Sequence, residues 1–428
     1  MNVLGSAVSY LKGLFLTEKS KRNIERMSDQ LGGNYQKDHH FISDSPWDGK
    51  EAMKIVAKKT NVALGPFEKQ GLMIDESSTK KSGKKSVGVS RQHNGNLGKI
   101  ENSQTGVYAS LSTNEKVCLV NARLYLPEEW TNDKERCLKV GVPLKDICYK
   151  TKPQLALDII DDLDQQGIKY GWIGADGLYG ASTEFKNQLD IRDKKYVLDI
   201  HCDQHVFTEE PEIFIPPKST GKGRKFTKLI TTKKSVEARK YKQTLGNEDY
   251  RPVRIRKGTK GWILANVHVT QIYTWDKKSD KAIEKTLIIT TRNSGETKYS
   301  ISSFTIQEKT PEEFAYMQSQ RHWIERAFQD SKSDLGLTEY QVRKYHAWYH
   351  HQALVMMAMN YVLLLKIERQ EDLPILSTAD VRYQIMAALK NKGANLGQEM
   401  EKMLKRHNQR TKDINRYYPN NEYFMSDS

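Results

Sequence analysis

Apolar residues recur at helical spacing, among lysines and arginines, in the first part of the chain. They are Tyr10, Leu11, Leu14, Ile24, Met27 and Leu31. Because a three- or four-residue period is typical of an amphipathic helix, residues 1 to about 68 are predicted to be helical. A loop containing His39, His40 and Pro46 is expected to follow these helices.

The pattern changes at residue 71, where short apolar runs begin to end in acids. Residues 71–74 are apolar and lead into Asp75, which predicts a buried strand with a carboxylate at its end. Residues 98–126 alternate well enough to predict two further strands, with a turn near Thr113 and Asn114. Three strands are therefore expected in this part of the chain.

A helix and two more strands are predicted to follow. Pro153 opens an amphipathic stretch that Gly167 ends, as expected for a helix. Residues 170–175 form an apolar run that leads into Asp176, and residues 196–200 form another strand. This order predicts a mixed α/β sheet. If its first and fourth strands are neighbours, the acids that follow them lie at one sheet edge.

Composition adds a candidate partner. The chain has 68 Lys and Arg against 53 Asp and Glu, a net charge of +15. This excess favours a polyanion such as nucleic acid, with a plain basic surface as the alternative. The longest apolar run, residues 353–365, is shorter than the roughly 20 residues that a membrane span needs. Four cysteines without CxxC spacing indicate a reducing, intracellular compartment.

Part of the positive charge is concentrated after residue 200. Residues 218–242 carry ten Lys or Arg and one acid, Glu237, and strand-like patterns follow at 261–269 and 282–291. These features predict a β-rich insertion with a basic arm, and a solvated linker is the alternative. Helical patterns return from Pro311 to about residue 366 and continue in a basic C-terminal part.

One predicted helix presents three charged side chains together. At 100° per residue, Arg321, Glu325 and Lys332 project within about 40° of one another. The apolar residues beside them are Ile324, Phe328 and Leu335. A surface ion pair at i, i+4 spacing is the simpler interpretation, and it stabilises a helix by only about 0.3 kcal/mol.

Three acids together favour a metal site over that interpretation. Asp75, Asp176 and Glu325 can hold two Mg²⁺ ions, because hard cations prefer oxygen ligands and offset the repulsion among carboxylates. Mn²⁺ suits the same all-oxygen ligands. Two such ions catalyse reactions at a phosphodiester, because one activates the attacking oxygen and the other stabilises the leaving oxygen. Arg321 and Lys332 are then expected to hold phosphates, the arginine as a bidentate fork and the lysine as a point charge.

At these residues the sequence resembles bacterial insertion-sequence transposases of the DDE superfamily, which have an RNase H-like catalytic core. The similarity extends from about residue 10 to about residue 365. The segments that carry it, in order, are residues 73–77, 84–89, 141–143, 151–153, 174–180, 323–328, 335–337 and 340–343.

The resemblance implies that Asp75, Asp176 and Glu325 are the catalytic, metal-binding acids. A subgroup of the family carries Tyr, Arg, Glu and Lys separated by two, three and six residues. Arg321, Glu325 and Lys332 match its last three places, whereas Gln318 stands where the tyrosine is expected.

The resemblance also implies a role for the insertion, which in relatives lies between the second acid and the glutamate and supplies an aromatic residue that holds a flipped base. Trp262 and Trp275 are the candidates, and a core position is the alternative for each. The expected DNA contacts of the basic arm are Lys222, Arg224, Lys225, Lys233 and Lys234.

The domains implied are an N-terminal helical DNA-binding region (1–68), an RNase H-like core in two parts (69–200 and 305–366), the β-rich basic insertion (201–304) and a C-terminal helical region (367–428).

The function implied is that of a DNA transposase, which binds the terminal inverted repeats of its element and catalyses metal-dependent cleavage and strand transfer. The resemblance implies double-stranded DNA as partner, a homodimer on DNA and a bacterial cytoplasmic, nucleoid-associated location. The alternatives are an RNase H-like nuclease without strand transfer, a catalytically silent DNA-binding regulator derived from a transposase, and a truncated relic.

Overall fold

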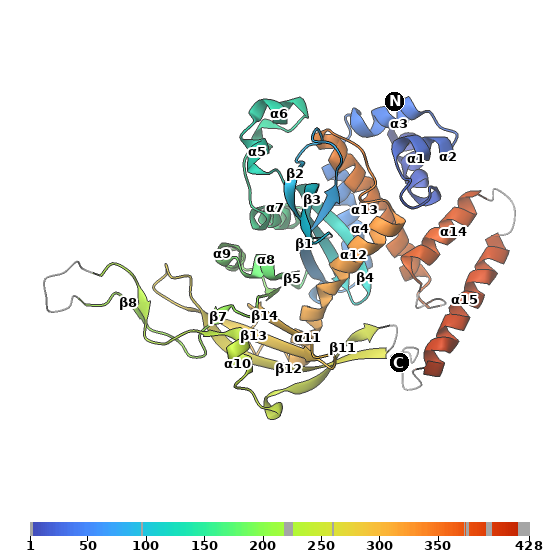
Figure 1. The fold of residues 1–428 in the computed structure, drawn as a ribbon. Coiled ribbons are helices and arrows are strands. Elements are labelled where there is room, and N and C mark those ends of the chain that lie inside the picture. The colour runs from blue at the N-terminus through green and yellow to red at the C-terminus, as the bar shows by residue number, and fades with distance from the viewer. Residues whose placement is uncertain are drawn as a thin grey trace. The chain divides into compact units, whose positions relative to one another are not determined.

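The protein is described from a computed structural model (Figure 1). The structure describes residues 3–95, 97–217, 226–258, 261–371, 373, 376–390 and 396–417. It divides into two compact units. The first unit contains Met1–Tyr170 and His322–Pro419, and the second contains Gly171–Arg321.

Four helices open the first unit. They are α1 (Val3–Leu16), α2 (Ile24–Gln30), α3 (Tyr35–Ser43) and α4 (Gly49–Ala63). Asn23, Asn34 and Asp48 cap the N-termini of the last three, because their side chains accept hydrogen bonds from the first-turn amides. The helical prediction is therefore confirmed. The predicted loop is wrong for His39 and His40, which lie within α3 beyond the Asn34 cap.

Four antiparallel strands follow in the first unit. They are β1 (Gly71–Lys80), β2 (Ser90–Asn94), β3 (Lys99–Thr113) and β4 (Lys116–Leu124). The long strand β3 pairs with each of the other three, and Asn114 turns the chain into β4 with φ of 53°. The three predicted strands and their turn are confirmed. The prediction that Asp75 ends its strand is wrong, because the polar residues after it continue to pair with β3 as far as Lys80. β2 was not predicted, because its sequence is polar throughout.

Helices flank these strands (Figure 1). The short helices α5 (Glu128–Thr131) and α6 (Lys134–Lys139) precede α7 (Lys152–Gln165). Thr151 and Gln154 form a capping box at the start of α7, and Gly167 follows its end with φ of 75°. Pro153 lies in the first turn of α7, so the helix predicted from Pro153 and Gly167 is confirmed.

The later helices of the first unit are α12 (His322–Asp334), α13 (Tyr345–Glu368), α14 (Thr378–Lys390) and α15 (Leu396–Tyr417). α12 contacts β1, β3 and β4, and α13 packs on α4 and β4. The predicted helical run from Pro311 to residue 366 is wrong in its continuity. α12 ends at Asp334, and Gly336 then adopts φ of 72°, which ends a helix readily.

The second unit is built on an extended sheet in the order β11-β12-β13-β14-β6-β5. Its strands are β5 (Trp172–Ala175), β6 (Tyr196–Asp199), β11 (Arg251–Gly258), β12 (Gly261–Thr274), β13 (Ile283–Arg292) and β14 (Thr297–Ser302). β5 and β6 are parallel, and the other pairs are antiparallel. The predicted β-rich insertion is thus confirmed, and in this sheet it includes β11 and β14 besides the two strands that the sequence predicted.

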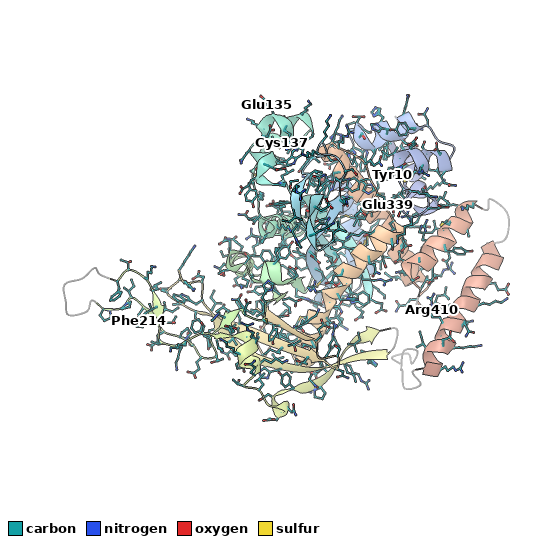
Figure 2. The ribbon with its side chains drawn as sticks, in the orientation of Figure 1. Tyr10, Glu135, Cys137, Phe214, Glu339 and Arg410 are labelled. Atoms are coloured by element: carbon teal, nitrogen blue, oxygen red, sulfur yellow. The ribbon has the colours of Figure 1, made fainter. Side chains whose placement is uncertain are left out.

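Short elements complete the second unit. Two small ladders pair β7 (His205–Val206) with β10 (Val236–Glu237) and β8 (Ile213–Phe214) with β9 (Ile230–Thr231). Phe214, labelled in Figure 2, is 39% exposed. The helices are α8 (Gly177–Gly180), α9 (Thr183–Ile191), α10 (Ala238–Lys242) and α11 (Pro311–Gln320). Single 3-10 turns occur at Phe67–Lys69, Leu144–Asp146 and Asn247–Asp249.

The fold class predicted from the sequence is confirmed: it is a mixed α/β structure in which helices flank sheet strands. The order β1, β3, β4, α7, β5 and β6 is the order that the sequence predicted, and β2 and the short helices α5 and α6 are added to it. None of the described helices combines the length and the apolar character that crossing a membrane requires.

Candidate functional site

Asp75 is half-buried within β1, opposite Tyr108 of β3. Its Oδ1 accepts a hydrogen bond of 2.7 Å from the amide of Glu76. The neighbouring Glu76 pairs with Lys152 at 2.7 Å, at the start of α7. Asp75 interacts instead with Lys332 of α12. Adjacent residues of a strand point to opposite faces, so Asp75 faces α12 and Glu76 faces α7.

α12 carries Glu325 and Lys332 seven residues apart, which places both on one face of the helix. Burial lowers the pKa of Lys332 to about 8, and the charge of Asp75 acts in the opposite direction. The side chain of Glu325 is about half exposed, and its Oε2 lies 3.9 Å from Nδ1 of His322. α12 therefore presents one accessible acid and one half-buried lysine from the same side.

The apolar side of α12 agrees with prediction only in part. Ile324 and Phe328 are buried, which confirms two members of the predicted stripe. Leu335 is buried too, but it follows the end of α12 at Asp334.

Arg321 lies at a break between two helices and not within one. α11 ends at Gln320 and α12 begins at His322. The amide of Arg321 donates to the carbonyl of Ser319, so the regular i to i−4 hydrogen bonding is interrupted there. The prediction that one helix projects Arg321 beside Glu325 and Lys332 is therefore wrong.

Asp176 directly follows β5 and caps α8, where its Oδ1 accepts a hydrogen bond of 3.0 Å from the amide of Leu178. In the parallel ladder of β5 and β6, Ala175 is paired with Leu198. Asp176 and Asp199 therefore occupy the next positions of two neighbouring strands, at the same edge. Their side chains belong to the second unit.

Asp199 was missed by the sequence analysis, although the structure gives it two charged or polar partners. Its Oδ2 accepts from Nε of Arg321 at 2.8 Å, and its Oδ1 lies 2.7 Å from Oγ of Ser300. The available signal was the apolar run 196–198 that ends in an acid, the same pattern that singled out Asp75 and Asp176.

The first place of the four-residue signature is filled by a buried residue. Gln318 is 4% exposed, and its Nε2 donates to Oγ of Ser300 at 2.7 Å. Tyr316, two positions earlier, packs its ring edge-on against Trp172 with ring centroids 5.9 Å apart. Gln318 thus bonds inside the second unit.

The predicted acids are divided between the units. Asp75 and Glu325 lie in the first unit with Lys332, and Asp176 lies in the second with Arg321. Over the described part of the chain, no group of three or more His, Cys, Asp and Glu side chains is gathered closely enough to hold a metal ion. The donor set of three carboxylates nevertheless has the chemistry that Mg²⁺ or Mn²⁺ requires, because all of its ligand atoms are oxygens.

A basic cavity of about 1000 Å³ lies in the second unit. Its lysines are Lys228, Lys233, Lys234, Lys277 and Lys278, and Trp275 also lines it. Lys233 forms an ion pair with Glu209. The lining of the cavity therefore contains one aromatic ring and several ammonium groups.

The loop between β12 and β13 holds Trp275 in this cavity. Nε1 of Trp275 donates to the carbonyl of Ser279 at 2.8 Å. Oδ1 of Asp276 accepts from the amides of Ser279 and Lys278, both at 2.8 Å. The hydrogen bond from the Ser279 amide is the largest of the effects that lower the pKa of Asp276. This loop is therefore fixed by its own side chains.

The other predicted contacts have different positions. Trp262 lies at the start of β12. The guanidinium carbon Cζ of Arg254 is 5.8 Å from the centroid of the Trp262 ring. Lys222, Arg224 and Lys225 fall outside the described residues. Of the two candidate tryptophans, Trp275 alone is among the residues that line the basic cavity.

A family model described as DDE superfamily endonuclease matches residues 5–262, a segment that contains Asp75 and Asp176 and ends before Glu325. The chain is 28% identical over 202 residues to a "Probable transposase for insertion sequence element IS701" of Microchaete diplosiphon. This match covers 47% of the chain and 50% of the relative, so the chain spans about half the length of the curated relative it matches.

A solved structure, described as a cryo-EM structure of the piggyBac transposase synaptic complex with hairpin DNA, is also similar. The match covers 96% of this chain and 76% of that one, at 11% identity and a TM-score of 0.42.

Proposed function

The chain belongs to the DDE superfamily of endonucleases, and on that premise we propose that it is a DNA transposase of an insertion sequence. In this proposal it binds the terminal inverted repeats of its element, cuts there and joins the new ends to target DNA. The observation that supports it most is the family match, which includes β1 with Asp75 within it and β5 with Asp176 directly after it.

Three carboxylates are proposed to hold the metal ions. Asp75, Asp176 and Glu325 would bind two divalent cations, Mg²⁺ or Mn²⁺, through carboxylate oxygens. When bound, such a pair of ions activates an attacking oxygen and stabilises the leaving oxygen of a phosphodiester. The Oδ1 atoms of both aspartates also accept amide hydrogen bonds, which orient these carboxylates.

Two cationic side chains are proposed to hold the DNA phosphates at the site. Lys332 is half-buried against Phe328, with Nζ 5.4 Å from the ring centroid, so its ammonium has limited freedom. Its pKa of about 8 leaves the side chain mainly protonated at neutral pH. Arg321 presents a planar guanidinium, which matches two phosphate oxygens at once. Because this chemistry transfers phosphoryl groups directly, it requires no nucleophilic side chain of the protein.

The basic cavity is proposed to contact the DNA near the cleavage site. Lys228, Lys234, Lys277 and Lys278 gather ammonium groups there, and nucleic acid binding depends on such groups to neutralise phosphates. Trp275 lines the same cavity and would stack on an unpaired base. Lys222, Arg224 and Lys225 are proposed as further DNA contacts on the basis of their charge alone.

Removing cavity lysines is expected to change the salt dependence of DNA binding. Lys234→Ala and Lys278→Ala should each reduce the slope of log Kd against log salt concentration by about 0.9, the value for one lost phosphate contact. The measurement is fluorescence anisotropy with a labelled duplex at several salt concentrations. Lys116→Ala, at the turn between β3 and β4, is the matched control and should leave the slope unchanged. Equal slopes in all four proteins would exclude this cavity from the DNA interface.

A strand-transfer assay distinguishes the proposal from its alternatives. The protein is incubated in Mg²⁺ with a pre-cleaved duplex from the DNA that flanks its reading frame, together with a supercoiled target plasmid. A transposase gives joined products, an RNase H-like nuclease gives nicked plasmid without joining, and a silent regulator gives neither while binding the duplex. Joining should require two protomers, so its rate should rise more steeply than linearly with protein concentration.

A further inference from the structure

Four polar side chains form a continuous hydrogen-bonded series at the end of β6. Arg321 Nε donates to Asp199 Oδ2 at 2.8 Å, and Ser300 Oγ lies 2.7 Å from Asp199 Oδ1. Gln318 Nε2 donates to Ser300 Oγ at 2.7 Å. An ionised carboxylate only accepts hydrogen bonds, so the Ser300 hydroxyl donates to Asp199 and accepts from Gln318. The direction of every bond in the series therefore follows from the carboxylate.

The backbone of the second unit holds these side chains in place. Ser300 of β14 is directly opposite Asp199 of β6 in the antiparallel ladder. Gln318 and Arg321 are three residues apart at the end of α11, so they lie on one side of that helix end. Ser300 is fully buried and Gln318 is nearly so. Two strands and one helix thus converge on a single carboxylate.

The position of Asp199 connects this series to the candidate site. Asp176 and Asp199 occupy the next positions after the paired residues Ala175 and Leu198 of β5 and β6. The carboxylate that holds Arg321 therefore lies at the same strand edge as a proposed metal ligand, within one compact unit.

Lys298 adds a second cation near Asp199. It stands two residues before Ser300 in β14, on the same face of the strand. Burial lowers the pKa of Lys298, the charge of Asp199 raises it and the charge of Arg321 lowers it further. Arg292 and Glu296, which also act on Lys298, form an ion pair of 2.7 Å with each other. Asp199 is therefore ion-paired with Arg321, and its charge also favours the protonated form of Lys298.

We propose that Asp199 is a positioning residue: it fixes the guanidinium of Arg321 for contact with a DNA phosphate, while Ser300 and Gln318 hold Asp199. This inference rests on the proposed function, because it takes the phosphate to be that of the DNA being cut. It also gives Gln318 a role of its own. Gln318, which occupies the first position of the signature, acts on Arg321 through Ser300 and Asp199. It does so where relatives have a tyrosine hydroxyl.

The physical reason is the flexibility of a free arginine. The side chain has many rotamers, and a phosphate contact made from an unrestrained side chain loses that freedom on binding. A carboxylate at Nε fixes the plane of the guanidinium before DNA arrives and hence the direction of its remaining N–H groups. The arginine then meets the phosphate already oriented, which favours the geometry of the reaction.

A double-mutant cycle tests whether Asp199 acts through Arg321. The variants are Asp199→Asn, Arg321→Ala and the double substitution. Each is assayed for single-turnover cleavage, in Mg²⁺, of a plasmid that carries the reading frame with its flanking DNA, and for affinity to a labelled duplex from that DNA. Asp199→Asn is expected to slow cleavage by about 10- to 100-fold, as loss of an orienting partner does, and to weaken affinity less. In the Arg321→Ala background it should have no further effect.

The controls separate positioning from stability. Asp190→Asn removes a half-buried ion pair of the same unit, in which Lys285 Nζ lies 2.8 Å from Asp190 Oδ1. It should lower the thermal unfolding midpoint as much as Asp199→Asn does, yet leave cleavage within about twofold, as expected for a pair outside the site. Ser300→Ala should show a smaller defect than Asp199→Asn, and its effect should also vanish with Arg321→Ala.

Three results would overturn the inference. Additive effects in the cycle would mean that Asp199 does not act through Arg321. Higher DNA affinity of Asp199→Asn would mean that the carboxylate competes with phosphate for the arginine. If Asp199→Asn abolished cleavage both alone and together with Arg321→Ala, and Ser300→Ala did not, Asp199 would be a metal ligand and not a positioning residue.

Failure of the proposed function is a separate outcome. If the wild-type protein binds the duplex without cutting or joining DNA, the proposed function is wrong. In that case the cycle of duplex affinities still decides whether Asp199 orients Arg321.

Discussion

Asp176→Asn is expected to reduce metal-dependent DNA cleavage by more than about 100-fold, while DNA affinity stays within about twofold of the wild type. The substitution replaces a charged oxygen ligand with an amide that hard cations bind poorly. It also keeps the shape of the side chain. Because Asp176 caps α8 through Oδ1 and asparagine caps helices equally well, the fold should be preserved.

The measurement is plasmid cleavage in Mg²⁺ beside duplex binding by anisotropy. Asp158→Asn is the matched control, because Asp158 lies on α7 and pairs with Lys150 at 2.6 Å. It should cleave as the wild type does. If Asp176→Asn also cleaves at the wild-type rate, the proposed carboxylate set does not bind the catalytic ions.

Glu339→Ala is expected to lower the free energy of unfolding by about 3–5 kcal/mol. The side chain of Arg22 has no exposed surface and lies 2.6 Å from Oε1 of Glu339, while Oε2 accepts from the Arg22 amide at 3.0 Å. Arg22 also donates to the carbonyls of Leu14 and Ser333. Removing Glu339, labelled in Figure 2, would leave a buried guanidinium without its counter-ion.

Urea unfolding, followed by circular dichroism, measures this change. Glu18→Ala is the control, because Glu18 pairs with Lys21 at a similar distance of 2.6 Å but on the surface, where solvent screens the pair and it contributes little to stability. The double variant Arg22→Met with Glu339→Met should be more stable than Glu339→Ala, since it removes both charges. If Glu18→Ala and Glu339→Ala lowered the free energy of unfolding equally, the buried ion pair would stabilise the fold no more than the surface pair does.

This ion pair also bears on the N-terminal helices. It connects the segment between α1 and α2 with the segment that follows α12. Tyr10 of α1 reaches α13 in the same unit, where its hydroxyl lies 2.9 Å from Nδ1 of His351. The first helices therefore pack into the unit that carries Glu325 and Lys332, and any DNA contact they make would come from this packed position.

Much of the fold could be predicted because its signals are local. The alternating pattern before Thr113 and the Thr151 cap with Pro153 define β3 and α7 within a few residues of sequence. The break at Arg321 has no such signal, because residues 311–334 are helical in composition throughout. β2 was missed for a related reason, since a polar strand depends on its pairing with β3.

The residues of the candidate site also fall into two groups, those that the local sequence predicts and those that it does not. Asp75 and Asp176 were found because each follows an apolar run, and Glu325 with Lys332 because helical spacing relates them. The partners of Asp199 could not be found from a local sequence pattern, because Ser300 and Arg321 are 101 and 122 residues away from it.

By itself, the sequence determined the order of the main strands and helices, the net positive charge and the acids that follow apolar runs, because each depends on neighbouring residues. Only the tertiary structure decided that Gln318 is buried, that Asp199 holds Arg321 and that Arg22 is neutralised by Glu339. The physical reason is that a charge or amide within a fold takes whichever partner the packing of distant segments brings to it.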